Sequence, residues 1–259
     1  EAPYLIGELE LRSTASIGVL LFNDELSGSH ELMKRADLSM YEAKAAGKNA
    51  LRFFDPAMQE SVSARLQLEE DIRRGLAAGE FVMYLQPQMD ENYSLIGAEA
   101  LVRWQHPQRG LLAPVAFIDV AEQAGLMGAL GQRVIDLAVA QCRRWLDAGI
   151  RRSVAVNVSP SQFANPAFVP TLLDTLKRAR VPAGLLSIEI TESIAMSATA
   201  EVEERLSTLR EAGIRIAIDD FGVGQSSFAY LRQLPVSELK IDKVFTQRIT
   251  DADIEAEGT

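Results

Sequence analysis

Five short runs along the chain alternate apolar and polar side chains, as β-strands with one buried face do. In each run the apolar residues share one parity, and a carboxylate, amide or ammonium group stands on the other parity at or near the C-terminal end. In a parallel barrel the apolar parity is covered by helices and the other faces inward, so these polar groups would meet at the C-terminal mouth. The runs are residues 98–104 (AEALVRW), 154–159 (VAVNVS), 186–191 (LSIEIT), 215–220 (RIAIDD) and 237–242 (SELKID).

Helix-length segments separate these runs, which is the spacing that parallel βα units require. A further run, residues 81–87, is joined to the strand at 95–104 through the turn-like sequence DEN at 90–92. So short a link predicts that this first pair of strands is antiparallel. The pattern therefore predicts an α/β fold with six strands in this part of the chain. The helices are expected at residues 114–123, 128–148, 160–179, 198–212, 226–232 and 244–250.

The organisation differs before residue 55, where about 54 residues are too few to bury a complete core of their own. Residues 56–78 follow with a charged amphipathic pattern that predicts a connector helix ending at Gly79. We therefore expect three parts: residues 1–54, a connector at 55–78, and a larger domain at 79–259. In the first part we expect a hairpin of residues 4–11 with 13–22, a helix at 31–46 stopped by Gly47, and a strand at 51–54.

Composition narrows the classes of function. The 259 residues carry a formal net charge of -10, which argues against a nucleic-acid polymer or an anionic membrane as partner. Cys142 is the single cysteine, so no disulfide framework exists and a reducing, cytoplasmic setting is the default. The chain shows no signal peptide and no apolar run near the ~18 residues of a spanning helix. It begins inside a predicted strand, so we expect a longer parent protein, which upstream segments could anchor in a membrane.

Residues 68–242 resemble the EAL domain, the cyclic di-GMP phosphodiesterase module of bacteria. They contain AEALVRWQHP, VAVNVS, IEITES, IDDFG and LKID in that order. The first 54 residues resemble the C-terminal third of a GGDEF domain, the module that makes cyclic di-GMP, through TASIGVLLF and KRADLSMYEAKAAGKNALRFFD. The GGDEF signature loop is absent, so no cyclase activity is expected of this chain. The resemblance implies a TIM-like (β/α) barrel with one antiparallel strand, and a homodimer formed through the EAL domain.

The resemblance also implies the residues of the site. Such an enzyme hydrolyses cyclic di-GMP to linear pGpG by a two-metal mechanism with Mg²⁺ or Mn²⁺. Lys240 would stand beside the attacking water, and Glu192 would anchor the loop after the fifth strand. Gln86 and Arg103 would contact the substrate. The implied metal ligands are Glu99, Asn157, Glu189 and Asp219, with Asp220 helping to hold a second ion; Glu99, Asp220 and Lys240 form the implied catalytic set.

Each of these residues also has a plain structural explanation. An inward carboxylate can belong to an ion pair, Asn157 can bond a strand end, and Lys240 can pair with Asp219. Glu192 can be an exposed acid at a helix N-terminus. His106 and the two tryptophans are expected to be structural. Taken together, however, four acidic groups brought into one site without a cation would repel one another and raise one another's pKa, which favours the metal site.

Two departures from the family pattern favour other functions. The loop after the fifth strand has Val223, Gln225 and Phe228 where Thr, Tyr and Leu are usual, which predicts weaker activity. The chain also ends after six predicted strands, so the last two strands of the family barrel are expected to be absent, and Glu257 receives no role. The alternatives are a non-hydrolysing receptor for cyclic di-GMP and a purely structural dimerisation module.

Overall fold

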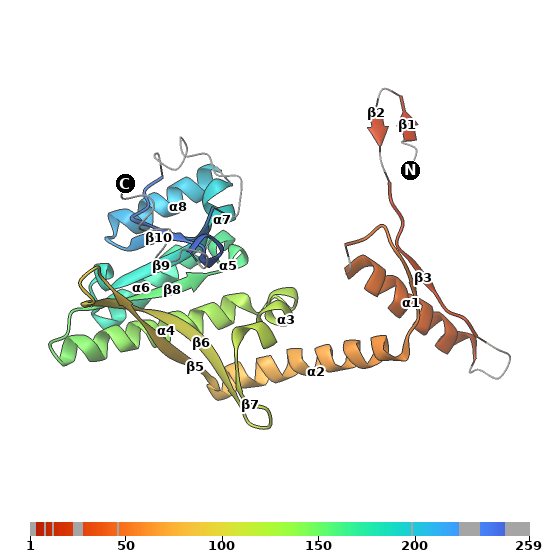
Figure 1. Ribbon diagram of the computed structural model, residues 1–259, viewed down its shortest axis with the longest axis horizontal. Coiled ribbons are helices and arrows are strands. Elements are labelled where there is room, and N and C mark those ends of the chain that lie inside the picture. The colour runs from red at the N-terminus through yellow and green to blue at the C-terminus, as the bar shows by residue number, and fades with distance from the viewer. Residues whose placement is uncertain are drawn as a thin grey trace, which may run out of the picture. The chain divides into compact units, whose positions relative to one another are not determined.

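The chain divides into two compact units, residues 1–70 and 71–259. A computed structural model of the protein, shown in Figure 1, describes residues 4–7, 9–11, 13–22, 28–45, 47–197, 199–222 and 234–246. The boundary between the units falls within helix α2 (Pro56–Ala78). Among the residues just given, no helix combines the length and the apolar character needed to cross a membrane.

The second unit is built on a mixed sheet in the order β11-β10-β9-β8-β6-β5, with β7 paired to β6. The five strands from β6 to β11 in this order are parallel, whereas β5 and β7 run antiparallel to β6. The antiparallel first pair is therefore confirmed, and so are the six predicted strands. The strands are β5 (Phe81–Met89), β6 (Leu95–His106), β7 (Gly110–Leu112), β8 (Ser153–Val158), β9 (Leu186–Thr191), β10 (Arg215–Phe221) and β11 (Glu238–Ile241).

Two predicted helices are interrupted. The helix expected at 160–179 is two helices, because Asn165 precedes a proline that favours extended backbone, and its φ and ψ are -69° and 122°. The helix expected at 114–123 starts as a 3-10 turn and breaks at Phe117. The predicted segment 226–232 lies outside the described residues. The helices of this unit are η1 (Pro114–Ala116), α3 (Ile118–Gln123), α4 (Met127–Asp147), α5 (Pro160–Ala164), α6 (Phe168–Ala179), η2 (Ala183–Leu185), α7 (Glu192–Met196), α8 (Ala200–Glu211) and α10 (Lys243–Thr246).

The core lies between the outer face of the sheet and the helices α4, α6 and α8. The apolar parity of β8, β9 and β10 is buried there, as predicted, and each fully buried aliphatic side chain contributes about 1.5 to 3 kcal/mol. In β11, however, Leu239 and Ile241 are 42% and 62% exposed. The side chains of the other parity lie on the inner face of the sheet. The strand residues of the core include Val154, Val156, Val158, Ile188, Ile190, Ile216 and Ile218.

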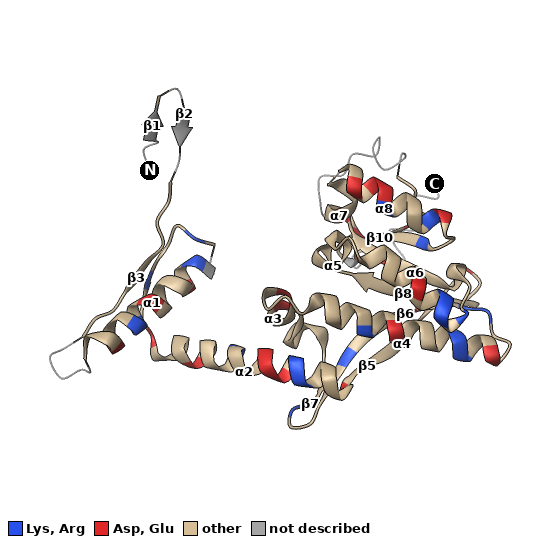
Figure 2. Ribbon diagram, turned by 180° about the vertical axis from the view of Figure 1, so that it is seen from behind, with Lys and Arg blue, Asp and Glu red and all other residues tan. Residues whose placement is uncertain are grey.

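Basic side chains gather where the helices of the second unit end. Arg144 lies in the last turn of α4, Lys177 and Arg178 in that of α6, and Arg210 in that of α8. Figure 2 shows this concentration of Lys and Arg near the ends of α4 and α6. A positive charge in the last turn offsets the partial negative charge of the helix C-terminus. These cations therefore stabilise the helices at the end of the sheet opposite the site described below.

The first unit contains a small hairpin and a separate parallel pair of strands. β1 (Tyr4–Ile6) turns back at Gly7 onto β2 (Leu9–Leu11), whereas β3 (Ile17–Val19) pairs in parallel with β4 (Leu51–Phe53). The predicted hairpin of residues 4–11 with 13–22 is therefore wrong, because the first run folds back on itself. Helix α1 (Ser29–Ala45) packs against β3 so closely that a Cβ at Gly18 would overlap its backbone.

Candidate active site

The ammonium group of Lys240 lies among three carboxylates at the inner face of the sheet. Its Nζ is 2.8 Å from Glu189 Oε2, 3.1 Å from Glu99 Oε2 and 3.3 Å from Asp219 Oδ1. These side chains come from four strands, β11, β9, β6 and β10. The pairing of Lys240 with Asp219, expected as the plain alternative, is present, but it is one of three such contacts.

Asn157 joins the cluster from β8. Its Nδ2 donates a 2.8 Å hydrogen bond to Glu99 Oε1, and the register of β8 and β9 places it beside Glu189. The four residues expected as metal ligands therefore lie together. In this arrangement the nitrogen of the Asn157 amide faces Glu99. Along the part of the chain that the structure describes, no three Asp, Glu, His or Cys side chains are grouped so that they could hold a metal ion as they stand.

The charges in this cluster depend on one another. Burial raises the pKa of Glu189 from 4.5 to about 7, and the carboxylates of Glu99 and Asp219 add to the rise against the opposing effect of Lys240. Burial disfavours the charged form of Lys240, but its hydrogen bond to Glu189 and the three surrounding carboxylates outweigh this effect and raise its pKa. Lys240 therefore stays an ammonium, while Glu189 is the acid whose charge changes near neutral pH.

The backbone turns sharply just after Asp219. Asp220 has φ at 54°, and the pairing of β10 with β11 shifts register between Ile218 and Phe221. Partial burial, the charge of Asp219 and a hydrogen bond with Asp242 raise the pKa of the Asp220 carboxyl. Asp220 is thus placed beside the cluster without joining the contacts of Lys240.

Glu192 contacts the start of the loop that follows β10. Its side chain is buried, and its Oε2 accepts a 3.0 Å hydrogen bond from the backbone N–H of Gly222. The alternative of an exposed acid at a helix N-terminus is therefore wrong. The substituted positions Val223, Gln225 and Phe228 lie outside the described residues, so the expected effect of that loop on activity stays a prediction.

The two residues expected to contact substrate lie on the inner face of β5 and β6. Gln86 is directly opposite Glu99 in the antiparallel register, and both line a cavity of about 290 Å³ together with Glu189 and Lys240. Arg103 lies further along β6 and contacts the ring of Tyr84. Tyr84 was not predicted as a site residue, although it stands two positions before Gln86 and hence on the same face.

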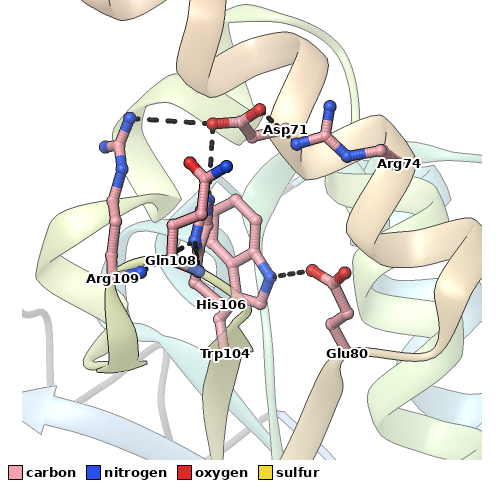
Figure 3. Close-up of polar contacts among 7 residues, drawn as sticks. All are labelled: Asp71, Arg74, Glu80, Trp104, His106, Gln108 and Arg109. Atoms are coloured by element: carbon pink, nitrogen blue, oxygen red, sulfur yellow. Dashed lines mark hydrogen bonds and ion pairs between the residues drawn. The ribbon is translucent and has the colours of Figure 1, made fainter.

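A buried polar network lies behind the site, on the outer face of β6 (Figure 3). Asp71 of α2 is 3.3 Å from Nε2 of His106, and the Nδ1 of His106 accepts hydrogen bonds from the backbone N–H groups of Gln108 and Arg109. His106 is therefore structural, as predicted. Asp71 had no signal in the sequence, because its partner lies 35 residues away.

Residues 69–257 match the EAL domain, so the chain belongs to the EAL domain family. It is 42% identical over 257 residues to the bifunctional diguanylate cyclase/cyclic di-GMP phosphodiesterase MucR of Pseudomonas aeruginosa, covering 97% of this chain and 37% of that protein. It is 34% identical over 247 residues to the cyclic di-GMP phosphodiesterase PdeR of Escherichia coli, covering 95% of this chain and 37% of that protein. The chain thus spans 37% of the length of these two relatives.

The fold is also similar to solved structures. The PaMucR phosphodiesterase in complex with c-di-GMP superposes with a TM-score of 0.68 at 41% sequence identity, over 74% of this chain and 78% of that one. The α/β fold of the EAL type, expected from the sequence, is therefore confirmed.

Proposed function

We propose that this protein hydrolyses cyclic di-GMP to linear pGpG with Mg²⁺ or Mn²⁺ as cofactor. The observation that carries the proposal is the convergence of Glu99, Glu189 and Asp219 on one positive charge at the inner face of the sheet. The names of MucR and PdeR describe cyclic di-GMP phosphodiesterases, and the related PaMucR structure contains c-di-GMP.

The donor set suits hard divalent cations. Three carboxylates and an amide supply oxygen ligands of the kind that Mg²⁺ and Mn²⁺ prefer. When bound, such ions would activate a water molecule and neutralise charge on the phosphoryl oxygens. The carboxylates of Glu99, Glu189 and Asp219 and the amide oxygen of Asn157 would hold such a cation, in exchange for the contacts that they make in this structure.

The remaining residues serve the substrate in this proposal. Arg103 presents a planar guanidinium whose forked N–H groups match two oxygens of a phosphodiester. Gln86, opposite Glu99, offers both a donor and an acceptor in the lining of the cavity. Lys240 would supply a positive charge beside the reacting phosphate, and Asp220 would help to hold a second ion. Glu192 keeps the backbone at Gly222 in place below the loop.

A non-hydrolysing receptor for cyclic di-GMP is the second candidate. One observation favours it: the ammonium of Lys240 already neutralises the three carboxylates. A receptor would bind the nucleotide without needing the metal ligands. Product analysis separates the two functions, because only the enzyme releases pGpG.

The experiment is incubation of the full-length protein with cyclic di-GMP and Mn²⁺, followed by chromatography of the nucleotides. We expect pGpG from the wild type and none above background from Glu99→Ala, which should also lose metal affinity in calorimetry while it keeps its fold. Glu91→Ala, in an exposed turn, is the matched control and should remain active. Binding of cyclic di-GMP without pGpG from the wild type would favour the receptor.

Several features of the parent protein are part of the same proposal. We infer that residues 1–54 are the end of a GGDEF domain, 55–78 a connector and 79–259 an EAL domain whose sheet closes into a TIM-like barrel. The match to bifunctional MucR supports the GGDEF assignment, because it covers 97% of this chain. A homodimer formed through the EAL domain and a cytoplasmic location of this segment complete the proposal.

A further inference from the structure

Tyr84 and Arg103 form a cation–π pair on the inner face of β5 and β6. The guanidinium carbon of Arg103 lies over the Tyr84 ring, 5.9 Å from its centre. One nitrogen of the same group, Nη1, donates a 2.8 Å hydrogen bond to the carbonyl of Val102. The ring and this carbonyl together fix the direction in which the guanidinium points, since a cation over a ring face is attracted by the quadrupole of the ring.

The register of β5 and β6 places Tyr84 and Arg103 on the same face of the sheet as Gln86 and Glu99. Tyr84 is opposite Leu101, one step along the same face from Gln86, which is opposite Glu99. Arg103 lies four residues beyond Glu99, and therefore roughly 13 Å further along the strand. The outer parity of the same strands, with Trp104 and Phe81, is buried under the helices. Tyr84 is 48% exposed, so the ring lies on the open side of the sheet.

The two cations of the site have different partners. Lys240 is held by three carboxylates, whereas the ion pairs found among the described residues give Arg103 none. An arginine has five N–H donors, and the Val102 carbonyl uses one of them. The guanidinium of Arg103 therefore keeps donors for an anionic ligand, and an uncharged partner, the Tyr84 ring, holds it in place.

We infer that Tyr84 is a positioning residue that aligns Arg103 for the phosphodiester of the substrate. This inference rests on the proposed hydrolysis of cyclic di-GMP and deepens it. An arginine on an open strand has many rotamers, and a ring beneath its guanidinium reduces the freedom that is lost on binding. Tyr84 therefore acts on substrate affinity, through Arg103, and leaves the chemical step unchanged.

The test is a double-mutant cycle on the full-length protein with cyclic di-GMP and Mn²⁺. We expect Tyr84→Leu to raise KM about 3- to 10-fold with kcat within about 2-fold, as the loss of a cation–π contact predicts. Tyr84→Phe, which keeps the ring, should behave as the wild type. In the Arg103→Ala background, Tyr84→Leu should change KM by less than about 2-fold, because the residue on which it acts is gone.

A second measurement needs no activity. The side-chain Nε–H resonance of Arg103 in ¹⁵N-arginine-labelled protein, assigned by its loss in Arg103→Ala, should carry a ring-current shift that Tyr84→Phe keeps and Tyr84→Leu removes. An unmoved resonance in Tyr84→Leu would overturn the inference. An equal rise in KM on Tyr84→Leu in the wild-type and Arg103→Ala backgrounds would also overturn it, because Tyr84 would then act on the substrate directly. A wild type that releases no pGpG would instead overturn the proposed function. The Arg103 resonance would still show whether Tyr84 contacts Arg103.

Discussion

Among the individual residues, Lys240 has the largest effect on the charge of the site. Three carboxylates within 3.3 Å of one ammonium would otherwise repel one another across a partly buried space. The side chain of Lys240 is 23% exposed, so water screens part of these attractions. Removal of the ammonium therefore leaves the carboxylates uncompensated, at a cost below that of a fully buried ion pair.

Lys240→Met should lower the free energy of unfolding of the metal-free protein by about 2 kcal/mol, because it leaves carboxylates unpaired. Addition of Mn²⁺ should recover much of this loss, since a cation can replace the missing charge. Urea unfolding with and without EDTA measures both effects. Lys177→Met, on the exposed last turn of α6, is the matched control and should change stability little. An equal loss in both variants would contradict the role of Lys240.

Glu189 predicts a pH dependence of stability. Its pKa is about 7 in the folded protein against 4.5 as its ordinary value, so the folded state favours the protonated form. The resulting stabilisation is complete below pH 4.5 and is lost as the pH rises through 7. In EDTA, wild-type stability should fall relative to Glu189→Gln across this range by up to about 3 kcal/mol. Parallel curves for the two proteins would show that Glu189 does not titrate in this way.

Among the elements, β6 carries a different function on each face. Its inner parity presents Glu99 and Arg103 to the site, and its outer parity presents Trp104 and His106 to the core. Trp104 Nε1 donates a 2.9 Å hydrogen bond to Glu80, and His106 bonds to Asp71 of α2. Because Nδ1 of His106 accepts two backbone N–H groups, Nε2 carries the hydrogen that Asp71 accepts. The last turns of α2 are therefore fixed to the back of the strand.

Asp71→Ala should lower the free energy of unfolding of the second unit by about 2 to 3 kcal/mol, because it removes a charged acceptor and leaves the buried Nε2–H of His106 unpaired. Tryptophan fluorescence during urea unfolding follows this change directly, since Trp104 packs edge-on against His106 with ring centres 4.8 Å apart. Asp119→Ala, an exposed acid in the first turn of α3, provides the control. If the two variants are equally stable, the network contributes nothing to the fold.

A strand pairing can be predicted from the sequence when it depends on neighbouring residues, and it is missed when it depends on distant ones. The alternation of residues 81–104 is local, so the antiparallel pair could be predicted from the pattern and the short link. The pairing of β3 with β4 could not be predicted, because these strands are far apart in sequence and are brought together by α1, which packs against both. The three-residue strand β7 forms only because β6 is there to pair with it. In the α5–α6 region, Asn165 and the proline after it were a local signal that could have been used.

At the scale of the whole molecule, the two units differ in the number of buried residues that each contains. Among the described residues up to 70, only Ser39 and Ala43 are fully buried, whereas the second unit holds the large core of strand and helix residues. Both tryptophans, Trp104 and Trp145, belong to the second unit. Tryptophan fluorescence therefore reports that unit alone, while ellipticity reports the helices of both.

We expect the 259-residue chain to unfold in urea in two steps. Ellipticity should begin to fall at a concentration about 1 M or more below the fluorescence transition, because the smaller core gives the first unit less stability. Asp71→Ala should lower the midpoint of the fluorescence transition. Coincident transitions by the two probes would mean that the units unfold together.

The convergence of the site could be predicted because strand parity puts every second side chain on one face. Parity predicts that Asn157, Glu189, Asp219 and Lys240 share the inner face, and the family resemblance adds Glu99 to them. Parity does not reveal distances, so it could not predict that Lys240 binds three carboxylates or that the Asn157 amide presents its nitrogen. Contacts across the sequence, such as Asp71 with His106, need the tertiary fold.

The attachment of α2 behind β6 has a consequence for genetic screens. If the proposed function holds, a random-mutagenesis screen for lost phosphodiesterase activity would recover changes at Asp71 and His106 as well as at Glu99, although the first two side chains lie on the outer face of β6. Sorting such hits by cellular protein level would separate them, because variants of Asp71 would be degraded more quickly while Glu99 variants would accumulate normally. The cellular level of each variant therefore has to be measured before any residue recovered in such a screen is given a catalytic role.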